Sequence, residues 1–426
     1  MKNLMVKEQY LAWEDGSPFF FLADTAWELA HRLDRQEVEH YFRIRKRQGF
    51  DAAQIVALAE FEGLTVPNAY GRLPLQLTDG LPDPEKPDTA GDYSYWDHLD
   101  YIVETAAAHD MFVTLLPTWG DKFNLLWGQG PVVFTPENAY TYGAWIGARY
   151  AGCWNIIWML GGDRPLLEPK HRAIIDAMAA GIRSADPSHL MTFHPPGKRN
   201  SVEYVGDADY IAFHASQTSH GIEQCYDSDL VMLEMRKTGK PYFDSEPRYE
   251  DHPACLDVKT KHYWNAADVR FNAYRSMLAG VCGHTYGNHC IWSMNREAVP
   301  YFPYVWQEAL IHPGAEQLHH VKTLRLSRDY FSLRPAKEAV LTEYHGMGRV
   351  TAARGRGYLY AYSPMGLAFS LEYTFPEANW VRASWFDPRT GEEAPFTIVP
   401  PCGRMTYVPP VSGTDWVLIL DADQGE

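Results

Sequence analysis

The chain has 426 residues, of which 46% are hydrophobic and 14% aromatic, a size that suits one large domain followed by a smaller one. Its formal net charge is −16, so we expect neither nucleic acid nor an anionic membrane as a partner. No stretch of about 20 apolar residues predicts a membrane span, and the N-terminus lacks the apolar core of a signal peptide, so we expect a cytoplasmic protein unless such a peptide has been removed.

Eight short apolar runs recur through the first three quarters of the chain. Runs of this kind are typical of parallel strands that are buried on both faces. They are Phe19–Asp24, Phe50–Val56, Met111–Pro117, Asn155–Asp163, His189–His194, Tyr210–Gln217, Pro241–Glu246 and Cys282–Trp292. Strands that alternate with helices predict an α/β fold, a (β/α)₈ TIM barrel over residues 1–330. An open doubly wound sheet is the alternative, but no GxGxxG motif follows the first run.

Helical signals separate these runs. Asp34 and Glu37 have the spacing of a capping box, and Thr135 followed by Pro136 is typical of a helix start. Helical spacing also extends over three further segments, 168–184, 226–238 and 264–279.

The ends of the first and third strands carry candidate sugar-binding residues, because barrel enzymes place their reactive groups after the carboxyl ends of strands. Asp24 ends the first strand and can either bind sugar hydroxyls or cap the next turn. Trp27 and Trp119 follow the first and third strands. Either ring can form a platform for a sugar or simply fill the core.

The fourth and seventh strands each end in an acid. Gly161 and Gly162 permit a sharp turn that presents Asp163 at the rim. Glu246 lies where the seventh strand must stop, since Pro247 cannot extend an inner strand. Strands four and seven face each other across a barrel mouth, so we expect the two carboxyl groups to meet there.

The remaining strand ends supply imidazole, amide, hydroxyl and indole groups. They can donate hydrogen bonds to sugar hydroxyls or orient a catalytic acid, although a buried histidine with a structural role is the simpler interpretation of any one of them. These candidates are His194, His214, Gln217, His284, Tyr286 and Trp292.

A pair of carboxyl groups has the chemistry that glycosidic cleavage requires. One must be protonated, to donate to the leaving oxygen, and the other must be ionised beside the anomeric carbon. Asp163 and Glu246 are the predicted pair. Alternatively, each acid forms only an ion pair with a neighbour, Asp163 with Arg164 and Glu246 with Arg248.

After about residue 330 the pattern changes to short strands separated by Gly, Pro and Asp turns. The runs Arg356–Tyr362, Trp380–Phe386 and Asp415–Leu420 are examples. We therefore predict a small antiparallel β-sandwich domain over residues 331–426.

The sequence predicts neither a cofactor nor a metal. The six cysteines form no Cys-x-x-Cys pair, and the first strand lacks the His-x-His pair that metallohydrolase barrels carry. No GxSxG motif is present, so a serine nucleophile is also not expected.

The motifs together resemble the apiosidase-like glycoside hydrolases, a group that includes glycoside hydrolase family 140. The segments that carry the resemblance are Phe20–Trp27, Gly161–Asp163, Asp244–Pro247, Gly283–Gly287 and Trp385–Gly391. The resemblance implies a (β/α)₈ barrel followed by a β-sandwich, with Asp163 as acid/base and Glu246 as nucleophile. It also implies an activity on pectin-derived oligosaccharides that contain apiose.

We therefore expect a retaining glycoside hydrolase that acts on a plant-derived oligosaccharide, as an apiosidase or another furanosidase. Two other classes of protein fit the same scaffold. One is a non-catalytic carbohydrate-binding protein, which would not need the acid pair. The other is a metal-dependent hydrolase, which a metal assay would identify.

Overall fold

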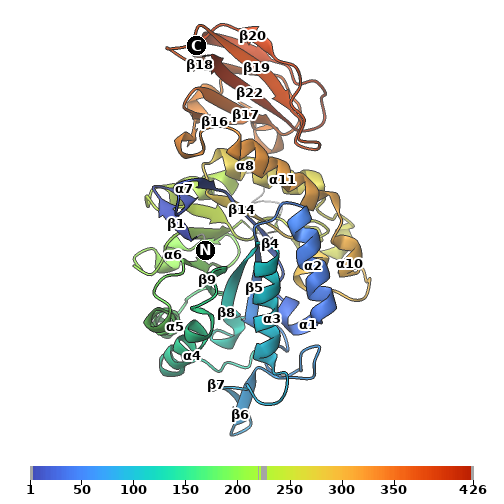
Figure 1. Ribbon diagram of the computed structural model, residues 1–426. Coiled ribbons are helices and arrows are strands. Elements are labelled where there is room, and N and C mark those ends of the chain that lie inside the picture. The colour runs from blue at the N-terminus through green and yellow to red at the C-terminus, as the bar shows by residue number, and fades with distance from the viewer. Residues whose placement is uncertain (1–2, 219, 222–227, 424–426) are drawn as a thin grey trace.

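A computed structural model of the protein describes residues 3–218, 220–221 and 228–423. The described chain forms a barrel of strands and helices, and a smaller domain of β-strands is stacked on one end of it (Figure 1). The predicted fold class, a TIM barrel followed by an antiparallel β-sandwich, is confirmed.

Eight parallel strands form the barrel wall. In wall order they are β4 (Phe21–Thr25), β5 (Ala52–Leu58), β8 (Phe112–Thr118), β9 (Ile156–Gly161), β10 (Met191–His194), β12 (His214–Gln217), β13 (Tyr242–Asp244) and β14 (Gly283–Tyr286). β14, the last of these strands, pairs with β4, the first. Between β10 and β12 the wall is completed by a hydrogen bond from the Ala212 amide to the Met191 carbonyl, 2.8 Å long.

Helices surround this wall and begin where the capping signals predict. They are α1 (Leu29–Arg32), α2 (Arg35–Arg47), α3 (Tyr95–Ala108), α4 (Pro136–Tyr150), α5 (Pro169–Ala185), α6 (Val202–Val205), α7 (Ser228–Arg236), α8 (Ala266–Leu278), α9 (His289–Trp292), α10 (Trp306–Ala309) and α11 (Pro313–Leu326). Asp34 caps α2 in a full capping box with Glu37, and Thr135 caps α4. Residues 226 and 227 of the predicted helix 226–238 lie outside the described residues.

Shorter elements complete the barrel domain. β1 (Leu4–Lys7), β2 (Tyr10–Trp13) and β3 (Pro18–Phe19) form an N-terminal antiparallel sheet. β6 (Leu75–Thr78) and β7 (Leu81–Pro87) form a hairpin in the long connection after β5. No helix in the described part of the chain combines the length and the hydrophobicity that a membrane crossing requires.

The eighth strand is shorter than predicted. It ends at Tyr286, whereas the sequence predicted a strand as far as Trp292. A Cβ atom at Gly287 would lie 2.0 Å from the ring of Tyr249, so the chain turns at a residue without a side chain. Asn288 then caps α9 by accepting a hydrogen bond from the Cys290 amide.

The alternation of side chains along the strands decides which residues face the barrel interior. Phe21, Phe213 and Phe243 pack against one another inside the barrel, with ring centroids 5.2 to 6.3 Å apart. Residues an odd number of positions away, such as Asp24, which is three positions beyond Phe21, therefore face outward, toward the helices.

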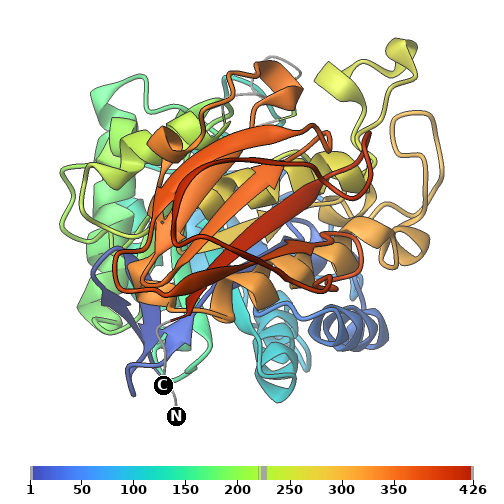
Figure 2. The same ribbon diagram turned by 90° about the horizontal axis from the view of Figure 1, so that it is seen from above.

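The C-terminal domain is built from two sheets. The larger contains β15 (Arg334–Pro335), β16 (Thr351–Gly355), β17 (Tyr358–Ser363), β19 (Trp380–Phe386), β20 (Thr397–Val399) and β22 (Trp416–Asp423), and the smaller pairs β18 (Phe369–Thr374) with β21 (Cys402–Tyr407). Leu359 and Leu418 belong to the core between the sheets. Their neighbours Tyr360 and Ile419 belong to the barrel core, so one face of the larger sheet packs on the barrel. Figure 2 shows this sheet from above, lying across the barrel.

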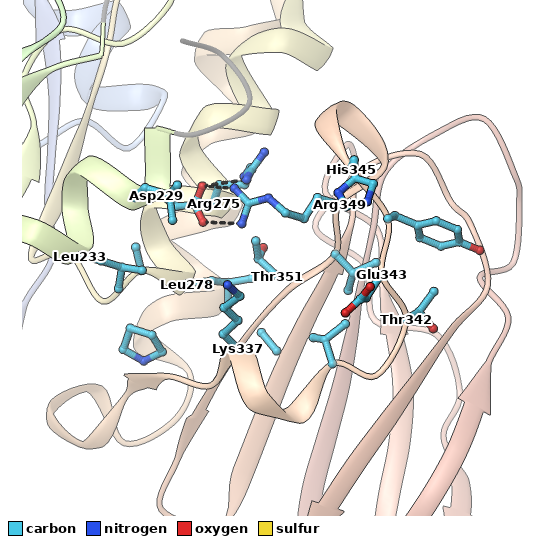
Figure 3. A pocket seen from close by; sticks show the side chains of 17 residues that line it. Asp229, Leu233, Arg275, Leu278, Lys337, Thr342, Glu343, His345, Arg349 and Thr351 are labelled. Carbon is cyan, nitrogen blue, oxygen red and sulfur yellow. Dashed lines mark hydrogen bonds and ion pairs between the residues drawn. The ribbon is translucent and has the colours of Figure 1, made fainter. Parts of the chain in front are cut away.

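Buried ion pairs join the two domains. Arg270 on α8 donates two hydrogen bonds, of 2.9 and 2.8 Å, to Asp415 at the start of β22. Asp229 on α7 contacts both Arg275 of α8 and Arg349 of the C-terminal domain, beside an interdomain cavity of about 320 Å³ (Figure 3). These contacts place the sandwich against α7, α8 and α11.

Candidate active site

Asp163 is presented by a turn that only glycine permits. Gly161 and Gly162 have φ angles of 94° and 104°, and Asp163 follows with φ 57°. A Cβ atom at Gly161 would lie 2.3 Å from the carbonyl oxygen of His194, and one at Gly162 would lie 2.7 Å from the amide nitrogen of Gly120. The neighbouring strands therefore leave no room for a side chain at either position.

The Asp163 carboxylate is held on one oxygen. Its Oδ2 accepts hydrogen bonds from Trp127 Nε1 and Arg164 Nη1, both 3.1 Å long. No hydrogen bond to Oδ1 comes from any residue that the structure describes. The side chain is 22% exposed, so this second oxygen remains available to a ligand at the barrel mouth.

Glu246 lies two residues beyond β13, next to two histidines. His194 Nε2 is 3.0 Å from Oε2, although the contact is not aligned as a hydrogen bond. His220 Nε2 makes a hydrogen bond of 3.0 Å to Oε1. The Glu246 side chain is only 9% exposed, so these rings form most of its polar surroundings.

The two carboxyl groups are pushed in opposite directions. Burial opposes ionisation of Glu246, but the contacts with His194 and His220 outweigh it and lower the pKa of Glu246 to about 2. Burial and the negative charge of Glu246 raise the pKa of Asp163 above its ordinary value, against the opposing charges of Arg164 and His194. The pKa of Glu246 therefore lies below that of Asp163, so Glu246 is the first of the two acids to ionise as the pH rises.

Aromatic rings line the site around His194. Trp27 and Trp119 lie 5.1 Å apart between centroids, and His194 lies 5.2 Å from the first and 5.7 Å from the second. Tyr249 packs against His220 at 4.4 Å. Burial and the charge of Glu246 raise the pKa of Tyr249 well above its ordinary value.

Several polar atoms around Glu246 are buried without a protein partner. Trp119 Nε1, His194 Nδ1, Gln217 Oε1 and His220 Nδ1 find no hydrogen bond within the described ranges of the chain. Buried polar atoms are usually satisfied, and a polar ligand bound beside Glu246 can supply the missing partners. A sugar, with hydroxyls on every side, supplies such partners.

A third carboxyl group lies beside Arg164. Glu60, just after β5, has its Oε1 3.4 Å from Arg164 Nη2, on the guanidinium that also holds Asp163. Burial, together with the charges of Asp163 and Asp121, raises the pKa of Glu60 to about 8, against the attraction of Arg164. Arg164 itself is fully buried.

Four of the predicted site residues face away from the barrel interior. Asp24 is buried between β4 and α2, where its Oδ2 accepts hydrogen bonds of 2.7 Å from Tyr41 and 2.6 Å from Arg45. The register pairs Tyr286 with Asp24 on the same outward face. The reason is the strand alternation, since a residue at a strand end faces the lumen only at every second position. We therefore correct the predicted substrate-binding set by removing Asp24, His214, His284 and Tyr286.

The contacts of Tyr286 and His214 fit structural roles. Tyr286 donates a hydrogen bond of 2.6 Å to Glu250, and His214 Nδ1 contacts the Ser201 hydroxyl at 2.9 Å. His284 is fully buried, and burial lowers its pKa to about 3.

Trp292 lies on α9, beyond the strand end. Its Nε1 donates a hydrogen bond of 3.2 Å to His289, and its ring lies 5.8 Å from that of Phe61, which follows β5. The side chain is half-buried, so it belongs to the outer rim of the barrel mouth.

Sequence reasoning missed Trp127, His220, Tyr249 and Glu60. None of the four lies within a strand, whereas reactive groups were expected at strand ends only. His220 follows β12 and Tyr249 follows β13, so the connections after those strands carried the missing signal. Within the described residues, no group of three or more His, Cys, Asp or Glu side chains has the arrangement of a metal site.

Comparison with known proteins shows the family of the chain. The sequence model of the apiosidase-like catalytic domain matches residues 6–332. The chain belongs to the apiosidase-like family. A second model, described as "Putative collagen-binding domain of a collagenase", matches residues 335–421. No functionally curated protein matches the sequence.

Two solved structures are similar over the full length of the apiosidase-like chain. One, titled a glycoside hydrolase, is 28% identical with a TM-score of 0.89, and the match covers 100% of this chain and 98% of that one. The other, a glycoside hydrolase family 5 protein from Bacteroides vulgatus ATCC 8482, is 29% identical with a TM-score of 0.89, over 100% of this chain and 95% of that one. The family and these relatives identify the chain as a glycoside hydrolase.

Proposed function

We propose that this glycoside hydrolase retains the configuration of its substrate, with Glu246 as nucleophile and Asp163 as acid/base. The observation that carries the proposal is the opposite displacement of the two pKa values. The pKa of Glu246 is lowered to about 2, while that of Asp163 is raised. Glycosidic cleavage by an acid pair needs this division of protonation at the start of the reaction, and retention of configuration is what the family resemblance implies.

In the first step a Glu246 oxygen attacks the anomeric carbon. The bond from that carbon to the leaving oxygen breaks, and Asp163 transfers its proton to the leaving oxygen. The products are a glycosyl ester on Glu246 and an alcohol. Asp163 has one oxygen held by Trp127 and Arg164, so Oδ1 is the oxygen that carries and donates the proton.

In the second step water replaces the alcohol. Asp163, now ionised, takes a proton from the water, whose oxygen attacks the anomeric carbon and releases the Glu246 carboxylate. The charge of Glu246 reappears as Asp163 regains its proton, so both groups return to their starting states. His194 and His220 hold the Glu246 oxygens in both steps.

The orphaned polar atoms around Glu246 support a small, hydroxyl-rich glycon. The family suggests a plant-derived substrate, with apiose or another furanose as the sugar that binds next to Glu246. Trp27 and Trp119 would then contact the apolar face of that sugar.

Two variants with different defects test the proposal. Glu246→Gln removes the nucleophile, so hydrolysis should fall by several orders of magnitude for every glycoside. Asp163→Asn removes the proton donor, so glycosides with poor leaving groups should lose most, while aryl glycosides with acidic phenols should retain their first step. Azide should restore turnover in Asp163→Asn, because it attacks the ester without a base.

Glu372→Gln, which changes an exposed acid on β18 of the C-terminal domain, is the control and should behave as the wild type. Equal slowing of both substrate types in Asp163→Asn, with no effect of azide, would overturn the acid/base assignment. Sugar binding without turnover in the wild type would instead favour a carbohydrate-binding protein.

A further inference from the structure

The two sides of the catalytic pair differ in chemistry. The Glu246 side has buried polar atoms that find no partner within the described chain, among them Gln217 Oε1 and Trp119 Nε1. The Asp163 side, where a leaving group must lie, instead has exposed apolar side chains. This contrast carries information about the leaving group, provided that the proposed function holds.

Trp127 fixes the position of the apolar side. Its Nε1 donates to Asp163 Oδ2 at 3.1 Å, and its ring lies 4.4 Å from the guanidinium of Arg164. The side chain is nevertheless 43% exposed. Because the acid must reach the leaving oxygen, a ring bonded to the acid must flank the group attached to that oxygen.

Three leucines extend this surface. Leu125 and Leu126 precede Trp127 and are 49% and 53% exposed, and Leu167 on the loop after β9 is 63% exposed. The two loops are joined near Asp163 by a hydrogen bond of 2.8 Å from Asn124 to the Pro165 carbonyl. We call Leu125, Leu126, Trp127 and Leu167 the apolar ridge.

The cationic side chains on these loops already form ion pairs or hydrogen bonds within the protein. Arg164 is fully buried and donates to Asp163 and to the Trp127 carbonyl. Lys122 is fully buried and bonds Asp121 at 3.0 Å. Lys170, at the start of α5, pairs with Glu168 at 3.1 Å. A negatively charged leaving group would find no free cation to balance its charge among the described residues of these two loops.

We propose that the apolar ridge is the leaving-group subsite and that it selects a neutral leaving group with an apolar face. An aromatic aglycone and an uncharged sugar ring both have this chemistry. A uronic acid, such as the galacturonic acid of a pectin backbone, does not. The inference rests on the proposed function, and it narrows the substrates to glycosides of neutral alcohols.

The test uses matched pairs of glycosides of D-apiofuranose, or of the sugar for which turnover is first found. The methyl and 2-naphthylmethyl glycosides have leaving alcohols of similar acidity but different apolar area. The galactosyl and galacturonosyl glycosides differ in charge alone. We expect kcat/KM to be about tenfold or more higher for the naphthylmethyl than for the methyl glycoside, and higher for the galactosyl than for the galacturonosyl glycoside.

Variants assign the preference to the ridge. Leu126→Ala and Leu167→Ala, on separate loops, should each reduce the naphthylmethyl preference to within about threefold of unity. Trp127→Phe keeps a ring and should retain the preference, whereas Trp127→Ala should lose it. Leu77→Ala, an equally exposed leucine on the β6–β7 hairpin, is the control and should leave the preference unchanged.

A high rate on the naphthylmethyl glycoside with no activity on the galactosyl glycoside would identify an aromatic aglycone as the leaving group. Comparable rates on the naphthylmethyl and galactosyl glycosides would show that the subsite accepts any neutral leaving group with an apolar face. Equal rates on the methyl and naphthylmethyl glycosides, or faster cleavage of the galacturonosyl glycoside, would overturn the subsite while leaving the proposed function intact. No turnover of any glycoside would overturn the proposed function and the subsite with it.

Discussion

The neighbours of Asp163 and Glu246 shift the pKa values of these two carboxyl groups in opposite directions. Glu246 contacts two histidines, whereas Asp163 faces the charge of Glu246 and shares Arg164 with Glu60. Burial alone would raise the pKa of both acids. The histidines therefore determine which of the two acids ionises more easily, and that acid is Glu246, the proposed nucleophile.

Replacing His220 with alanine should make Glu246 harder to ionise. The contact with His220 helps to lower the pKa of Glu246 to about 2, and burial would raise that pKa once the contact is lost. The acid limb of the pH profile of kcat/KM should then move upward by roughly one to two pH units. His109→Ala, at the far end of α3, is the control. An unchanged acid limb in His220→Ala would contradict the assignment of Glu246.

Asp163→Asn should stabilise the fold at the cost of activity. An acid whose pKa is raised by folding stabilises the protein at low pH, and that stabilisation is lost as the pH rises through the folded-state pKa. Asparagine does not titrate, so the difference in Tm between variant and wild type should become more positive from pH 4 to pH 8. The expected gain is on the order of a degree or two. A difference that falls over this range would show that Arg164, rather than burial, dominates.

The sequence alone predicts the two acids but not their partners. Asp163 follows Gly161 and Gly162, which occupy a turn that excludes side chains. Glu246 precedes Pro247, which ends a strand. The backbone role of these neighbours is recognisable from the sequence, and it marks both acids. His220 and Tyr249 lie in irregular connections, where no periodic pattern marks a direction. Asp24 misled the prediction because a polar residue at a strand end can face either the lumen or the helices.

The glycine turn after β9 determines where Asp163 lies. Gly16 has a similar φ angle of 83° but open space around it, whereas Gly161 is in close contact with the His194 carbonyl. Gly16→Ala should therefore cost about 1 kcal/mol of unfolding free energy, from backbone strain alone. Gly161→Ala should cost roughly 2 kcal/mol more, since the strands must separate.

Chemical denaturation measures these costs, and kinetics measure the displacement of Asp163. Gly161→Ala should lower kcat by about a hundredfold or more, because a shift of an ångström suffices to misplace an acid. Equal costs for the two variants, with kcat unchanged in Gly161→Ala, would show that the turn is not what positions Asp163.

The elements themselves were largely predictable. Apolar runs marked the barrel strands, and capping signals at Asp34 and Thr135 marked helix starts. The eighth strand was overestimated because the apolar residues after Gly287 belong to α9, and a short apolar run does not distinguish a strand from a buried helix.

At the scale of the whole molecule, the sandwich is held to the barrel by buried charges. Asp415→Ala would leave Arg270 without its two hydrogen bonds in a site where both side chains are 5% exposed. We expect a loss of about 3–5 kcal/mol of unfolding free energy. Glu372→Ala breaks the exposed pair with Arg404 and should cost less than about 1 kcal/mol. Similar losses in the two variants would contradict a structural role for the interdomain pair.

The formation of an ester on Glu246 is the central claim, and trapping that ester tests it most directly. A 2-deoxy-2-fluoro glycoside with an acidic leaving group slows the second step more than the first, so the intermediate should accumulate and be visible by mass spectrometry of the digested protein. We expect one glycosyl unit on the peptide that contains Glu246, and no adduct in Glu246→Gln. A glycosyl adduct on a different residue, or a product of inverted configuration without any adduct, would contradict it.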